Sequence, residues 1–137
     1  MLPTIPSSIK DTNDFLQSLR ATGPLPPDSL LVTLDVSTLY PSIPHNDGLS
    51  ALRSFLQDRR YSPVFIEGII QLTQFVLSKN YFTFEDEIYP QKSGTAIGTV
   101  MAVVYSIIFM DNFERTAMDS FALNIHTFLR FIDDIFD

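Results

Sequence analysis

The stretch Leu129-Arg-Phe-Ile-Asp-Asp-Ile-Phe136 places two adjacent carboxylates, Asp133 and Asp134, inside an otherwise hydrophobic run. Apolar and aromatic residues on both sides of the pair favour a strand that leads into a tight hairpin turn. An ionised carboxylate in such surroundings is costly unless it is paired or bound to a metal ion. An Asp-Asp pair is expected about once by chance in a chain of this composition, so the pair alone is a weak signal.

A second hydrophobic run, residues 30–36, contains a single carboxylate, Asp35. The run predicts a strand buried on both faces. If this strand lies beside the one that leads to Asp133, both acids reach one site. Mg²⁺ prefers one or two carboxylates together with substrate phosphates, which favours a metal-dependent phosphoryl or nucleotidyl transferase. The competing interpretation is that these acids are ordinary turn and capping residues.

Composition limits the other classes of function. The chain has 137 residues, of which 45% are hydrophobic, and this is a globular composition with no cysteine for disulfides or thiolate metal sites. The net charge of −7 argues against a self-sufficient nucleic-acid binder, because phosphates are neutralised by clustered Lys and Arg. The N-terminus does not resemble a signal peptide, and the uncharged run 93–110 predicts a buried helix rather than a membrane span.

Apolar periodicity and the positions of Pro and Gly predict an α+β fold, with a small antiparallel sheet backed by three to four helices. Residues 1–29 are expected to form an N-terminal helix and a Pro-rich linker, and residues 30–137 the main domain. Asn46 or Asp47 is expected to cap the second helix. The expected helices are 10–20, 46–59, 63–78 and 99–119, the hairpin is 81–84 with 88–90, and the strands are 30–36 and 124–132.

Three segments, in order, resemble the core motifs of reverse transcriptases, most closely those of Penelope-like retroelements. Leu34-Asp-Val-Ser-Thr-Leu-Tyr-Pro-Ser-Ile-Pro-His45 resembles polymerase motif A. Gln91-Lys-Ser-Gly-Thr-Ala-Ile-Gly-Thr99 resembles motif B, and Leu129-Arg-Phe-Ile-Asp-Asp-Ile-Phe136 resembles motif C. The resemblance covers most of the chain and implies a partial polymerase palm that adds dNMP to a primer 3′-hydroxyl, with RNA template, DNA primer and dNTPs as partners.

The resemblance also implies roles for single residues. Asp35, Asp133 and Asp134 would be the catalytic acids that hold two Mg²⁺ ions, with Mn²⁺ as a possible substitute. Tyr40 would be the steric gate that selects dNTPs, although an ordinary core aromatic would look the same. The other implied nucleotide-binding residues are Val36, Ser37, Thr38 and Leu39, through their backbone amides, and Gln91, Gly94 and Thr95. A plain connector between hairpin and helix would need the same glycines.

Two departures from the family pattern stand out. Motif B carries Val100, Val103 and Ile107 where the family usually has a basic residue, a proline and an asparagine. The resemblance also leaves the family's fingers, thumb and endonuclease segments unmatched. The sequence therefore predicts a fragment that is inactive alone, intracellular, and nuclear if it derives from an active element. The alternatives are a non-catalytic domesticated remnant that binds other proteins, an unfolded gene fragment, or a different metal-dependent nuclease.

Overall fold

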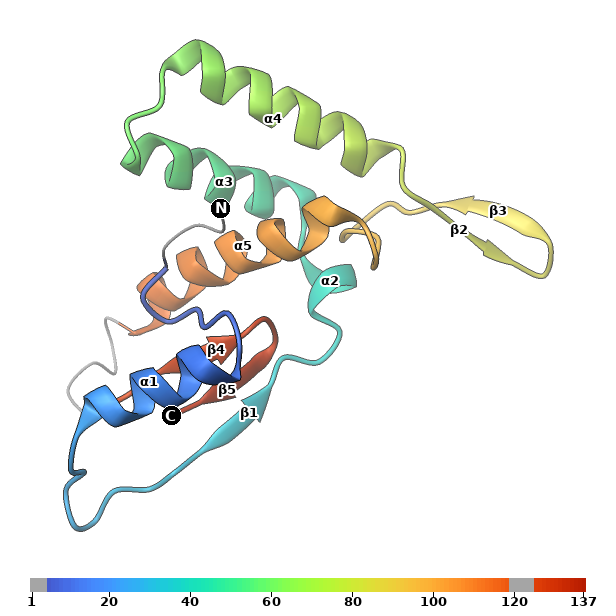
Figure 1. Ribbon diagram of the computed structural model, residues 1–137. Helices are drawn as coiled ribbons and strands as arrows, with labels where there is room; N and C mark the ends of the chain where they lie inside the picture. The colour runs from blue at the N-terminus through green and yellow to red at the C-terminus, as the bar shows by residue number, and fades with distance from the viewer. Residues whose placement is uncertain (1–4, 119–124) are drawn as a thin grey trace. The chain divides into compact units, whose positions relative to one another are not determined.

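The computed structural model describes residues 5–118 and 125–137 (Figure 1). The chain divides into two compact units. The first unit comprises Met1–Ser37 and Phe113–Asp137, and the second comprises Thr38–Asn112. Helix α5 (Val100–Met118) begins in the second unit and ends in the first.

The first unit contains a three-stranded antiparallel sheet of β1 (Thr33–Asp35), β5 (Asp134–Phe136) and β4 (Leu129–Phe131), in the order β1-β5-β4. The backbone pairing of β1 continues past its first residue, because Val32 and Asp137 exchange two hydrogen bonds of 2.6 and 2.9 Å. Helix α1 (Thr12–Thr22) contacts this sheet through an edge-to-face pair of Phe15 and Phe136, with ring centroids 5.3 Å apart.

Helices dominate the second unit: α2 (Leu39–Ser42), α3 (His45–Asp58) and α4 (Pro63–Ser78), with the start of α5. Helix α4 begins at Pro63 because proline suits the first turn, and the Ser62 hydroxyl accepts a hydrogen bond from the Phe65 N–H. Helices α3 and α4 lie side by side (Figure 1). Each buries one mainly apolar stripe, as expected for amphipathic helices. The buried residues are Gly48, Ala51, Leu52, Phe55 and Leu56 on α3 and Ile66, Ile70, Thr73 and Leu77 on α4.

The second unit also contains the hairpin of β2 (Tyr81–Phe84) and β3 (Glu87–Pro90). Its two turn residues, Glu85 and Asp86, have φ of 48° and 62°. Positive φ at both central residues is the signature of the type I′ turn, whose twist matches that of the flanking strands.

The mixed helix-and-strand class with small antiparallel sheets is confirmed. The described residues contain five helices rather than three or four, because α2 forms outside the four helices expected from the sequence. In addition, the Tyr81–Pro90 hairpin forms a second sheet of its own. No helix in the part of the chain that the structure describes is both long and apolar enough to cross a membrane.

Three local expectations were wrong. Residues of β1 are exposed rather than buried on both faces, and among the described strands β1 lies at the edge of the sheet and pairs with β5 alone. The N-cap of α3 is Pro44, without a side-chain cap, rather than Asn46 or Asp47. The strand expected at 124–132 is limited to Leu129–Phe131 among the described residues. Residue 124, and residue 119 at the expected end of the last helix, lie outside them.

Candidate functional site

The acidic residues of motifs A and C come together in the first unit, at one end of the sheet. In the β1–β5 ladder, Asp35 is the partner of Asp134, so both side chains emerge on the same face of the sheet. Asp133 lies in the turn between β4 and β5, and its carbonyl oxygen accepts a hydrogen bond of 3.0 Å from the Val36 N–H. Asp35 and Asp134 are exposed, whereas Asp133 is half-buried. We call these three residues the acidic cluster.

The hairpin turn that carries Asp133 has an unusual backbone. Ile132 has φ of 59°, while Asp133 is not among the residues with positive φ. A positive φ at only the first central residue is the type II′ pattern, which normally has glycine there. A β-branched residue in this region is a genuine outlier and costs about 1–3 kcal/mol. The surrounding structure must therefore hold the turn in place.

Arg130, three residues before Asp133, is fully buried. Its Nε forms a short ion pair with Oε1 of Glu114 on α5, and its Nη1 donates a 2.9 Å hydrogen bond to the Ile132 carbonyl. The other Glu114 oxygen accepts a 2.6 Å hydrogen bond from the Ser7 hydroxyl. Glu114 therefore holds the Arg130 side chain inside the unit.

Asp35 and Asp134 of the acidic cluster offer two exposed carboxylates on one face of the sheet. Within residues 5–118 and 125–137, no group of three or more His, Cys, Asp or Glu side chains is arranged to hold a metal ion. A closed protein cage is therefore not formed. Mg²⁺ usually keeps several waters and binds one or two carboxylates plus phosphates, and two exposed carboxylates on one face fit that donor set.

The residues after Asp35 differ in whether their backbone N–H groups are available to bind an anion. The Val36 N–H donates its hydrogen bond to the Asp133 carbonyl. Thr38 has φ of 53°, in the left-handed region, immediately before α2. A backbone that changes hand in this way can make successive N–H groups point to one side and form an anion-binding concavity. Leu39 is buried, and Ser37 and Thr38 are exposed.

In the second unit, the motif B loop packs against α2 and the residues that follow it. Backbone bonds run from the Gly94 N–H to the Ile43 carbonyl (3.1 Å) and from the Thr95 N–H to the Tyr40 carbonyl (2.9 Å). Gly94 has φ of 72°, and a Cβ there would lie 2.4 Å from the Pro41 backbone. The glycine is therefore required by close packing on Pro41, as the connector interpretation allows.

The side chains of Tyr40 and of the motif B residues differ in burial and in hydrogen bonding. Tyr40 and Gln91 are half-buried, and the Gln91 amide donates a 2.9 Å hydrogen bond to the Ser93 carbonyl. Thr95 is buried, and its hydroxyl has no hydrogen-bond partner among the described atoms. The structure thus brings Tyr40 and Thr95 together through their backbones in the second unit, as it brings the acidic cluster together in the first.

His45 is a structural residue that the sequence did not single out for this loop. Its Nε2 lies 2.8 Å from the Gly94 carbonyl oxygen, and because a carbonyl only accepts, Nε2 carries the proton. The His45 carbonyl in turn accepts a 3.3 Å hydrogen bond from the Tyr105 hydroxyl on α5. The contact joins residues 49 positions apart, which no local pattern could have predicted.

Burial, with a smaller contribution from the Asp47 carboxylate, raises the pKa of Tyr105 to about 12. In the unfolded chain the pKa of tyrosine is about 10. The folded state therefore binds the phenolic proton more tightly, and this contribution to stability is complete below pH 10 and is lost as the pH rises towards 12. We expect thermal unfolding of Tyr105→Phe to change less between pH 9.5 and 11.5 than that of the wild type. Equal pH dependence of the two proteins would contradict the assignment.

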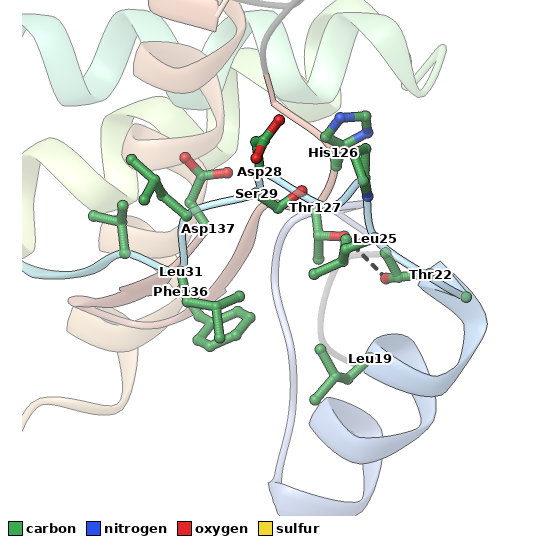
Figure 2. A pocket seen from close by; sticks show the side chains of 14 residues that line it. Leu19, Thr22, Leu25, Asp28, Ser29, Leu31, His126, Thr127, Phe136 and Asp137 are labelled. Carbon is green, nitrogen blue, oxygen red and sulfur yellow. Dashed lines mark hydrogen bonds between the residues drawn. The ribbon is translucent and has the colours of Figure 1, made fainter.

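A cavity of about 560 Å³ lies elsewhere in the first unit, where the β1–β5 ladder ends at Val32 and Asp137 (Figure 2). Its lining is mostly apolar and includes Leu19, Leu31 and Phe136, and a 2.9 Å hydrogen bond joins the hydroxyls of Thr22 and Thr127 beside it. None of the three acids of the acidic cluster lines it. The cavity is thus separate from the candidate site.

An antiparallel sheet with paired acids at a hairpin turn, contacted by helix α1, is the arrangement expected of a polymerase palm. The family model described as "Reverse transcriptase (RNA-dependent DNA polymerase)" matches residues 4–136. The chain therefore belongs to the reverse transcriptase family.

A solved structure of telomerase from Candida albicans, in complex with a TWJ fragment of telomeric RNA, is similar to this chain with a TM-score of 0.72 and 12% sequence identity. The match covers 95% of this chain and 26% of the telomerase chain, so the present sequence spans about a quarter of that protein. At this identity the likeness concerns the fold. A comparison with curated proteins gave no match.

Proposed function

We propose that this chain is a fragment of an RNA-directed DNA polymerase, and that its acidic cluster binds the metal ions that serve addition of dNMP to a primer 3′-hydroxyl. The observation that supports this most strongly is the pairing of Asp35 with Asp134, next to the hydrogen bond from Val36 to Asp133. Motifs far apart in the sequence thereby place three acids at one end of one sheet. We further propose that residues 30–137 are a partial palm of the Penelope-like type.

In this proposal Asp35 and Asp133 are the principal metal ligands, and Asp134 supports the site. Two bound Mg²⁺ ions would supply activation of the 3′-hydroxyl and stabilisation of the departing pyrophosphate. The chain itself contributes the antiparallel pair of β1 and β5, which holds the acids in position before substrate binds. Preorganised charge of this kind avoids reorganisation during the reaction.

We propose that the nucleotide lies against the turn after Asp35. The amides of Ser37, Thr38 and Leu39 are the candidate phosphate donors, since the Val36 amide is occupied. The Tyr40 ring would stack under the deoxyribose and exclude a 2′-hydroxyl. The motif B residues Gln91, Gly94 and Thr95 are proposed as further nucleotide-binding residues. Since Thr95 is buried and its N–H donates to the Tyr40 carbonyl, its contribution would be to support Tyr40.

The 137-residue chain is expected to show no primer extension by itself. Transfer requires primer, template and triphosphate to be held together in line. The nine Lys and Arg residues are outnumbered by 16 acids, which gives weak electrostatic affinity for nucleic acid. An assay with an annealed RNA template and DNA primer, dNTPs and Mg²⁺ or Mn²⁺ tests this. Synthesis that disappears in Asp133→Asn would contradict inactivity while supporting the polymerase assignment.

A second candidate function is a protein-interaction module that no longer catalyses. The motif B replacements favour it: Val100, in place of a basic residue, is 93% exposed, and nearby Ile97 is 76% exposed. Apolar side chains at these positions suit a protein partner better than a phosphate. If Asp35→Asn and Asp133→Asn leave the cellular role of the protein unchanged while Val100→Lys abolishes it, the module interpretation holds and the polymerase interpretation fails.

A further inference from the structure

We propose that Arg130 is a positioning residue that fixes the turn carrying Asp133 and Asp134, an inference that rests on the metal-binding function proposed for these acids. Two contacts of the Arg130 guanidinium matter for the turn. Nε pairs with Glu114, and Nη1 donates to the Ile132 carbonyl, one residue before Asp133. The same side chain therefore connects α5 to the backbone of the acidic turn.

The backbone of Arg130 is held as firmly as its side chain. Its N–H donates to the Ser7 carbonyl (2.7 Å), and its carbonyl accepts from the Ile9 N–H (2.9 Å). Ser8 thereby forms a parallel bridge with Arg130, on the side of β4 away from β5. The Ser7 hydroxyl also binds Glu114, the ion-pair partner of Arg130. Segment 7–9 thus orders both members of the buried pair.

A buried ion pair usually adds little to the net stability of a fold. Desolvation of the two charges offsets most of their attraction, and well-packed apolar residues often serve equally well. The planar guanidinium offers something that an apolar side chain does not, namely several N–H donors in a fixed fork. Here one of these N–H groups donates to the Ile132 carbonyl. The positive φ of Ile132 costs free energy, and the backbone would relax from it without this support. We infer that the pair serves the geometry of the turn.

The hydrogen bond from the Val36 N–H to the Asp133 carbonyl connects the geometry of the turn to the proposed metal binding. It joins β1 to the turn at the level of Asp35, so a displaced turn would separate Asp35 from the acids of motif C. Arg130 acts through the peptide backbone and does not itself touch metal or substrate in this scheme. Its loss should therefore weaken metal binding without removing a ligand.

The test compares the wild type with Glu114→Gln/Arg130→Met, which removes the charges of the Arg130–Glu114 pair and keeps an acceptor for Ser7. Arg130→Met alone would leave Glu114 buried and uncompensated, so it serves only as the destabilised reference. A second variant, Arg130→Lys, keeps the positive charge but lacks the planar guanidinium with its several N–H donors. Three quantities are measured: the midpoint of thermal unfolding, amide hydrogen exchange of Val36, and the Mn²⁺ concentration that half-broadens the amide NMR signals of 33–36 and 132–136.

We expect the double variant to unfold close to the wild-type temperature. Its Val36 amide should exchange about tenfold faster, because the bond to Asp133 is no longer held. The exchange of the Gly48 amide in α3, which is bonded to Pro44, should not change. Half-broadening should need about tenfold more Mn²⁺, the usual effect of losing a residue that orients a metal ligand. Arg130→Lys should shift both readouts in the same direction.

A folded double variant or Arg130→Lys with wild-type Val36 exchange and wild-type Mn²⁺ broadening would overturn the proposal, since Arg130 would then be structural only. Failure of the proposed function looks different: the wild type itself would show no Mn²⁺ broadening that depends on Asp35 and Asp133. In that case faster Val36 exchange in the variants would still establish that Arg130 positions the turn.

Discussion

Asp35→Asn is expected to weaken Mn²⁺ binding by the chain at least about tenfold, since removal of a ligand should cost no less than removal of a residue that orients one. The same substitution should raise the midpoint of thermal unfolding by about 2 °C. Asp35 and Asp134 are directly opposite on one face of the sheet, and like charges in that position repel. Affinity for the ion and stability of the fold are thus expected to change in opposite directions.

A matched control is Asp86→Asn, because Asp86 is an exposed acid in the β2–β3 turn of the second unit, and Asn tolerates its φ of 62°. It removes the same charge and should alter neither Mn²⁺ binding nor stability appreciably. Asp133→Asn should reproduce the loss of affinity. If Asp35→Asn and Asp86→Asn have the same effect on Mn²⁺ binding, the affinity for Mn²⁺ depends only on net charge. The acidic cluster would then not be a metal-binding site.

Gly94→Ala is expected to destabilise the second unit by about 3 kcal/mol. The new Cβ would lie 2.4 Å from the Cα and carbonyl oxygen of Pro41, which are backbone atoms that cannot rotate away. The φ of 72° adds the ordinary cost of the left-handed region for a residue with a Cβ. Chemical denaturation followed by circular dichroism measures the loss.

Gly68→Ala is the control for this change. Gly68 is exposed within α4, and a Cβ there would meet nothing within 4 Å. Alanine favours the helix by about 0.5–1 kcal/mol over glycine, so this variant should be more stable than the wild type. The same chemical replacement should therefore have opposite signs at the two positions. A Gly94→Ala protein as stable as the wild type would mean that the motif B loop does not pack on Pro41 as described.

Features set by local chemistry could be predicted from the sequence. Helix α4 has the predicted bounds because Ser62 caps it, Pro63 suits its first turn, and its apolar residues repeat with the helical period. The β2–β3 hairpin follows from two runs of strand-forming residues around a short turn. The fold class followed from the same patterns, and the family from the order of three motifs.

Features that depend on partners far apart in the sequence could not be predicted. Burial of Arg130 depends on Glu114, 16 residues away on another element, and on Ser7 at the other end of the chain. The exposure of β1 depends on its place at the edge of the sheet, which its own hydrophobic residues do not encode. Likewise, the occupied amide of Val36 is a consequence of the register between β1 and the turn.

The most direct measurement is a crystal structure of the chain grown with Mn²⁺, in which anomalous scattering locates the ion. We predict a peak bound by the carboxylate of Asp35 together with that of Asp133 or Asp134, with the Arg130–Ile132 hydrogen bond intact beside it. An ion bound only at unrelated surface acids, or an Asp35 side chain on the opposite face of the sheet from Asp134, would contradict the polymerase-site account.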